Sequence, residues 1–119
     1  MTYELKHGKA LVIIGPQGCG KSKLAREIAG AHGVFIEIDA ADMRSPLMLG
    51  AVLAQQPDVL IIDNAQRVSD HLEALIANEY VLCQRRGRKS ITVKTPRIII
   101  CGLNLDVDAH SSRFDVVAI

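Results

Sequence analysis

The chain has 119 residues, of which 49% are hydrophobic and 23% charged, and its formal net charge at pH 7 is +1. A chain of this length can bury one modest core, so we expect residues 1–119 to form a single domain. The near-neutral charge excludes a globally basic surface, and any contact with a polyanion must be local. No apolar run is long enough to cross a bilayer and the N-terminus lacks a signal-peptide core, which predicts a cytoplasmic protein without a membrane partner.

The first chemical signal lies between an apolar run, residues 10–14, and a segment with helical periodicity, residues 21–29. Glycines in such a connection let backbone amides turn toward phosphate oxygens. Lys21 supplies a cation for the β and γ phosphates of a nucleoside triphosphate, and the Ser22 hydroxyl suits Mg²⁺. The phosphate-binding P-loop predicted here consists of Gly15, Pro16, Gln17, Gly18, Cys19, Gly20, Lys21 and Ser22.

The next two segments are a predicted strand and a predicted helix. Residues 34–39 favour a strand that ends in Asp39, a residue that either faces a ligand or caps the following helix. Of these two roles, capping is favoured. Residues 45–56 predict a helix, with Pro46 near its start and Pro57 beyond its end.

The second chemical signal is the run of four aliphatic residues, 59–62, that leads to Asp63 and Asn64. Such a run is too short for a helix and is typical of a buried strand. The strand would hold the Asp63 carboxylate at the carboxyl edge of a sheet, near a Mg²⁺-bound water beside Ser22. An aspartate that merely begins a turn is the alternative.

The segment that follows is predicted to be one helix over residues 69–84, because its apolar residues recur at spacings near three and four. Residues 85–97 then contain no acidic residue, and residues 90–94 alternate as an exposed strand or hairpin does. Cations on a projecting hairpin can follow the phosphate backbone of single- or double-stranded DNA, whereas a solvated basic face is the alternative. The candidate cations are Arg85, Arg86, Arg88, Lys89 and Lys94.

A third aliphatic run, residues 97–102, predicts another buried strand and leads to Asn104. A neutral amide there can orient an attacking water without adding charge beside the γ phosphate, although asparagine is also a common turn residue. Residues 115–119 predict a final strand. Five strands separated by helices predict a three-layer α/β fold with a parallel sheet.

These motifs, in this order, resemble the core of AAA+ P-loop ATPases, in particular superfamily-three helicases and phage or plasmid replication ATPases. The resemblance rests on residues 15–22 as Walker A, residues 59–63 as Walker B, the strand before Asn104, and Arg113 before the last strand. It implies ATP with Mg²⁺, the sheet order 5-1-4-3-2, and a homo-oligomer in which Arg113 reaches the nucleotide of a neighbouring subunit. A local ion pair of this arginine with a nearby aspartate is the alternative.

Two features depart from the family. Asn64 stands where the family usually has glutamate, and because an amide cannot accept a proton, we expect slow hydrolysis. The sequence ends after the fifth strand, so we expect no C-terminal helical lid.

The favoured function is an ATPase acting on nucleic acid. The alternatives are an ATP-gated interaction module with little turnover and a small-molecule or nucleotide kinase. Such kinases commonly place an aspartate after their second strand, as Asp39 is placed here.

Overall fold

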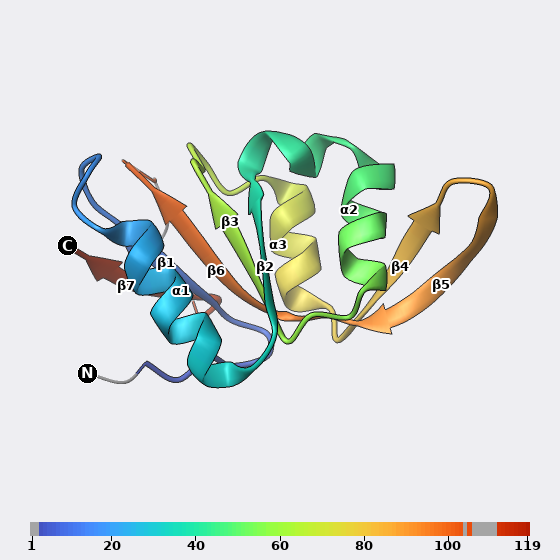
Figure 1. The fold of residues 1–119 in the computed structure, drawn as a ribbon, viewed down its shortest axis with the longest axis horizontal. Coiled ribbons are helices and arrows are strands. Elements are labelled where there is room, and N and C mark those ends of the chain that lie inside the picture. Colours follow the sequence, from blue (N-terminus) through green and yellow to red (C-terminus); the bar gives the residue numbers. More distant parts are fainter. Residues whose placement is uncertain (1–2, 104, 106–111) are drawn as a thin grey trace.

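The structure is a computed structural model of the chain, and it describes residues 3–103, 105 and 112–119. Its elements form a parallel sheet with helices on both faces, and a separate hairpin projects at one end (Figure 1). Asn104, a predicted site residue, lies outside the described residues. In chain order the elements are β1 (Ala10–Ile14), α1 (Lys21–His32), β2 (Phe35–Asp39), the 3-10 helix η1 (Ala40–Arg44), α2 (Pro46–Ala54), β3 (Val59–Asp63), α3 (Asp70–Ala77), β4 (Tyr80–Arg85), β5 (Arg88–Lys94), β6 (Arg97–Gly102) and β7 (Phe114–Ala118).

The main sheet has five parallel strands in the order β2-β3-β6-β1-β7. Counted along the chain without the hairpin strands, this is the predicted order 5-1-4-3-2. The register sets Ala10 of β1 against Ile98 of β6 and Phe114 of β7, and it sets Asp39 of β2 against Asp63 of β3. Because all strands are parallel, the ends of β1, β2 and β3 that carry the candidate site residues meet at one edge of the sheet.

Two hydrophobic cores lie on opposite faces of this sheet. In β3, Val59 and Ile61 pack in the core beneath α1, whereas Leu60 and Ile62 pack in the core formed with α2, α3 and the hairpin. All four side chains are fully buried. This two-sided burial explains why the central strands are continuous aliphatic runs instead of alternating sequences. No helix in the described part of the chain has the length and apolar character needed to cross a bilayer.

The helix predicted over residues 69–84 is wrong after Ala77. Residues 80–85 form β4, which pairs antiparallel with β5, Tyr80 lying opposite Lys94. Asn78 ends α3, and the Thr95 hydroxyl donates to the Asn78 carbonyl at 2.7 Å, which ties the start of one hairpin strand to the end of the other. Exposed residues of β4 alternate with less exposed ones at a period of two, as in a strand. Pairing with β5 therefore determines the structure of this segment, although its apolar residues are also spaced as in a helix.

The segment before β3 also differs in detail from the prediction. The helix expected over residues 45–56 is α2, which covers residues 46–54, and Ser45 caps it by accepting from the Met48 amide. A 3-10 helix, η1, precedes it and was not predicted. Asp39 caps η1, with its Oδ1 accepting from the Ala41 amide at 2.9 Å. The favoured capping role of Asp39 is therefore confirmed.

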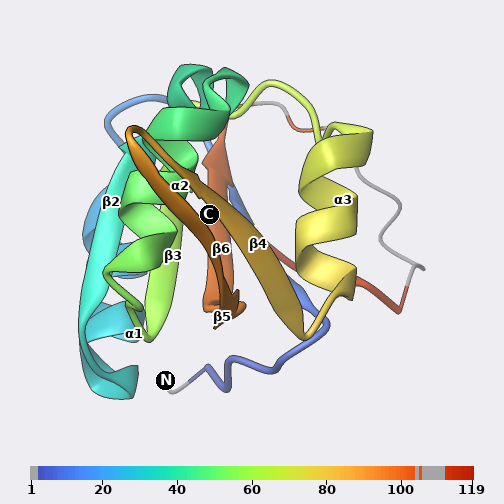
Figure 2. The same cartoon turned by 90° about the vertical axis from the view of Figure 1, so that its right-hand side faces the viewer.

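Gly50 allows the hairpin to pack closely against α2. A β-carbon at this position would lie 2.1 Å from the carbonyl oxygen of Gln84 in β4. Figure 2 looks onto this hairpin, with α2 on one side of it and α3 on the other. We expect Gly50→Ala to lower the free energy of unfolding by about 1–3 kcal/mol, because backbone must move to admit the methyl group.

Gly30→Ala is the matched control for Gly50→Ala in urea unfolding. Gly30 lies in α1, and its added β-carbon would meet only the Phe35 ring, at 3.9 Å. The gain in helix propensity should raise stability there by up to about 1 kcal/mol. Equal effects of the two substitutions would contradict a tight contact between α2 and β4.

Candidate nucleotide-binding site

The connection between β1 and α1 has the backbone that a phosphate cradle needs. Gly18 and Gly20 have φ angles of +81° and +92°, a conformation that residues with a β-carbon rarely adopt. Gly20 is the N-cap residue of α1 and has no side chain to accept from the first-turn amides. A β-carbon on Gly15 would lie 2.7 Å from both Cys19 Sγ and the Ile119 carbonyl oxygen. The free amides and the positive end of α1 therefore fit a phosphate group.

Ser22 and Asp63, which the sequence separates by 41 residues, are hydrogen-bonded. The Ser22 hydroxyl donates to Asp63 Oδ2 at 2.9 Å. Hydroxyl and carboxylate oxygens are the ligands that Mg²⁺ prefers. The part of the chain that the structure describes contains no cluster of three or more His, Cys, Asp or Glu side chains suited to a metal. This sparse set fits Mg²⁺ held partly by waters and substrate phosphates, rather than a metal enclosed by protein ligands.

The Lys21 side chain folds back over the loop that precedes it. Its Nζ donates to the carbonyl oxygens of Gly15 at 2.7 Å and Pro16 at 3.0 Å. The ammonium group is therefore held at the mouth of the glycine cradle. Because a lysine head group is a compact charge on a flexible stem, it can exchange these carbonyls for phosphate oxygens.

Asn64 is bound to the neighbouring strand through its side chain. Its Nδ2 donates to Asp39 Oδ2 at 2.8 Å, and its backbone amide donates to Asp63 Oδ1 at 2.9 Å. Its φ of 57° is left-handed, a conformation that asparagine tolerates better than most residues. The Asp39–Asn64 contact was not predicted. The available signal was that Asp39 ends one predicted strand, that Asn64 follows another, and that the strand order implied by the resemblance makes these two strands neighbours.

The amide of Asn64 and the backbone N–H of Ala41 lower the pKa of the Asp39 carboxyl, the Asn64 bond having the larger effect. A carboxylate whose pKa is lower in the folded than in the unfolded state stabilises the fold at pH values above the unfolded-state pKa. This stabilisation is lost as the pH falls through the folded-state pKa. We expect Asn64→Ala to raise the folded-state pKa of Asp39 toward its unfolded value, so that the stabilisation is smaller and is fully lost at a higher pH. An acid titration of the Asp39 carboxyl carbon by NMR checks this, with Asn78→Ala as the control. An unchanged titration midpoint would contradict the hydrogen bond.

The AAA family model, described as "ATPase family associated with various cellular activities (AAA)", matches residues 11–97, which contain both candidate motifs. The chain belongs to the AAA family.

Two curated relatives of different kinds match parts of the chain. The Holliday junction branch migration complex subunit RuvB of Campylobacter hominis is 29% identical over an alignment of 102 positions that covers 77% of this AAA chain and 30% of that protein. The sn-glycerol-3-phosphate import ATP-binding protein UgpC 3 of Agrobacterium fabrum is 47% identical over 34 residues, 29% of this chain and 10% of that protein. The chain thus spans less than a third of either curated relative.

A solved structure shares the fold of this AAA chain. The A form apo structure of the NrS-1 C-terminal region superposes with a TM-score of 0.72 at 22% sequence identity. The match covers 98% of this chain and 30% of that one. At this identity the likeness concerns the fold alone.

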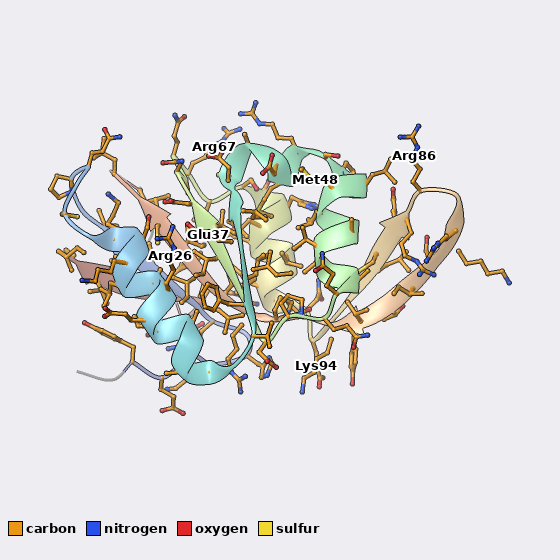
Figure 3. All side chains as sticks on the ribbon, in the orientation of Figure 1. Arg26, Glu37, Met48, Arg67, Arg86 and Lys94 are labelled. Carbon is orange, nitrogen blue, oxygen red and sulfur yellow. The ribbon has the colours of Figure 1, made fainter. Side chains whose placement is uncertain are left out.

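The predicted cations of the hairpin lie away from the phosphate loop. The hairpin is at the opposite end of the molecule, and Figure 3 shows Arg86 at its tip. Arg85 is held within the hairpin, its Nε and Nη2 donating to the Lys89 carbonyl at 2.9 and 2.8 Å, whereas Arg86, Arg88 and Lys89 are exposed. The predicted hairpin and its basic surface are therefore present.

Arg113 is exposed immediately before β7, at the sheet edge formed by that strand. Its carbonyl accepts from the Ala10 amide at 2.8 Å, which anchors the backbone beside β1. Asp115, two residues after Arg113, forms an ion pair with Lys9 at 3.3 Å. Whether Arg113 acts on a nucleotide remains a prediction from position.

Proposed function

We propose that this AAA ATPase domain binds ATP with Mg²⁺, hydrolyses it slowly and acts on nucleic acid. The observation that carries the proposal is the 2.9 Å hydrogen bond between Ser22 and Asp63, which joins the two sequence motifs at one edge of the sheet. The left-handed glycines at 18 and 20 add support, because they leave the amides at the start of α1 open to an anion.

In this proposal residues 15–20 hold the phosphates through backbone amides, and Lys21 neutralises their charge. Ser22 and Asp63 hold Mg²⁺, which when bound neutralises charge on the β and γ phosphates. Asn104 orients water, and Arg113 contributes to a nucleotide on a neighbouring copy in a homo-oligomer. These last two roles rest on the resemblance of the sequence to AAA+ proteins.

Slow hydrolysis follows from the chemistry of Asn64. An amide at this position cannot take a proton from water, and its Nδ2 is already bound to Asp39. The described residues place no carboxylate other than Asp63 and Asp39 at the ends of β3 and β2. Both are engaged in hydrogen bonds, so we propose that neither replaces the usual glutamate efficiently.

Action on nucleic acid is supported by the exposed cations of the hairpin. Positive side chains on a projecting element can contact successive phosphates without reading sequence. The name of the RuvB relative, which refers to Holliday junction branch migration, is consistent with DNA as the polyanion.

Phosphate release measured with and without single-stranded DNA tests the proposed function. We expect measurable turnover that DNA stimulates, and DNA binding that weakens with salt. Replacing Arg86, Arg88 and Lys89 with alanine should reduce the log–log salt slope by about 2, if each cation neutralises one phosphate. Absence of nucleotide binding by the wild type would refute the ATPase proposal, and an unchanged slope would refute only the hairpin's role.

The bond between Asn64 and Asp39 also favours a second candidate, an ATP-gated interaction module. If turnover is very slow, bound ATP persists and can hold an assembled state. Light scattering with ATP and with ADP compares the two states. A particle mass that is the same with ATP and with ADP would exclude this candidate.

A further inference from the structure

A cleft of about 650 Å³ opens at the carboxyl ends of β2 and β3. One wall is η1 with the start of α2, and the facing wall is the segment from residue 64 to residue 72. No residue of the loop 15–22 lines it, although Asn64, which directly follows Asp63 of the candidate nucleotide site, does. Clefts of this volume are typical of sites for small molecules.

The floor of the cleft is apolar and its rim is cationic. Ile62, Ala65 and Leu72 are buried beneath it. Arg44 comes from η1 and Arg67 from the facing wall, and Figure 3 shows Arg67 at this edge of the sheet near η1. Within the described part of the chain, neither arginine forms an ion pair with a carboxylate.

The carboxylate that lines the cleft is already engaged. Asp39 is the only acidic residue among the described lining residues, and it accepts from the Ala41 amide and from Asn64 Nδ2. The cleft is therefore lined by two arginines and by one carboxylate that other donors already bind. Planar guanidinium groups recognise phosphate and carboxylate oxygens through paired, charge-assisted hydrogen bonds.

We propose that this cleft binds a small organic anion, a phosphate or carboxylate that carries an apolar group. Arg44 and Arg67 bind the anionic end, and Ile62, Ala65 and Leu72 lie beneath the apolar group. A concave site with an apolar floor favours a small molecule over a nucleic-acid backbone, which needs an extended positive surface. The assignment does not depend on nucleotide binding at residues 15–22.

Phenyl phosphate is the probe, because it joins an anion to an apolar ring. In ¹⁵N-resolved NMR titrations we expect saturable shifts of amides in residues 40–44 and 64–72. Phenol lacks the charge and inorganic phosphate lacks the ring, so both should bind this cleft more weakly. The double variant Arg44→Ala/Arg67→Ala should lose at least about tenfold in affinity for the probe. Lys6→Ala/Lys23→Ala removes two exposed cations outside the cleft and should leave the affinity unchanged.

The site-resolved signals separate this proposal from the proposed function. Lys21→Ala should abolish any shifts in residues 15–22 and preserve those around the cleft. Shifts confined to residues 15–22 would overturn the cleft proposal, as would equal affinity for phenol or no effect of the double arginine variant. Shifts in the cleft amides caused by a thymidine oligonucleotide but not by phenyl phosphate would assign the arginines to nucleic acid and overturn the small-molecule site.

Discussion

Replacing Asn64 with glutamate is expected to raise ATP turnover by about 100-fold or more, because a positioned general base typically contributes that much to a reaction. The carboxylate would follow Asp63 directly, at the edge where Ser22 lies. Repulsion from Asp39, which now accepts from Asn64 Nδ2, would turn the new side chain away from β2. Phosphate release at saturating MgATP measures the effect.

Asn64→Gln is the control for this prediction, since it has the shape of glutamate without a group that takes a proton. Both variants place a longer side chain at a φ of 57°, which costs each about 1–2 kcal/mol, and repulsion from Asp39 should lower the unfolding temperature of the glutamate variant further. Equal turnover in the two variants would show that the missing carboxylate does not limit hydrolysis. Faster turnover in the glutamate variant alone would support the hypothesis that the wild type hydrolyses ATP slowly because Asn64 cannot act as a base.

Replacing Lys21 with alanine is expected to weaken ATP binding by about 10- to 100-fold, the loss of one charge-assisted contact to phosphate. In the structure the ammonium group contacts the Gly15 and Pro16 carbonyls beside the glycine cradle, so it is already near the proposed phosphate position. Isothermal titration with MgATP measures the change in affinity.

Lys23→Ala is the matched control, because Lys23 is an exposed lysine two residues further along α1. It removes the same charge from the same helix without touching the loop. A similar loss of affinity in both variants would indicate a general electrostatic effect and contradict a specific contact from Lys21. Retained affinity in Lys21→Ala would contradict the assignment of residues 15–22 as the phosphate site.

The sequence alone was sufficient for features that depend on neighbouring residues. The P-loop spacing of residues 15–22 is local, because each glycine meets a backbone requirement within the same turn. The buried strands were recognisable for a similar reason: parallel strands covered on both faces are continuous aliphatic runs, as residues 59–62 and 98–100 are. The strand order was implied by the resemblance to AAA+ proteins, and the structure confirms it.

Contacts between distant segments depended on the tertiary structure. The hairpin replaced the end of the predicted helix because Tyr80 pairs with Lys94, and short-range spacing carries no information about such a partner. The cleft beside η1 likewise exists only because residues 40–44 and 64–72 face each other across the ends of two strands.

The sequence by itself determined that this chain carries a phosphate-binding loop and an aspartate at the end of a buried strand. The tertiary structure added the contacts themselves: Ser22, which the sequence already predicted near Asp63, donates to its carboxylate, and Asn64 is bound to Asp39. The physical reason is that both contacts join segments far apart in the chain. The Ser22–Asp63 bond runs from the start of α1 to the end of β3, and the Asn64–Asp39 bond runs from the end of β3 to the end of β2. They depend on which strands lie side by side and in what register, and these are fixed by the packing of the whole sheet between its two cores.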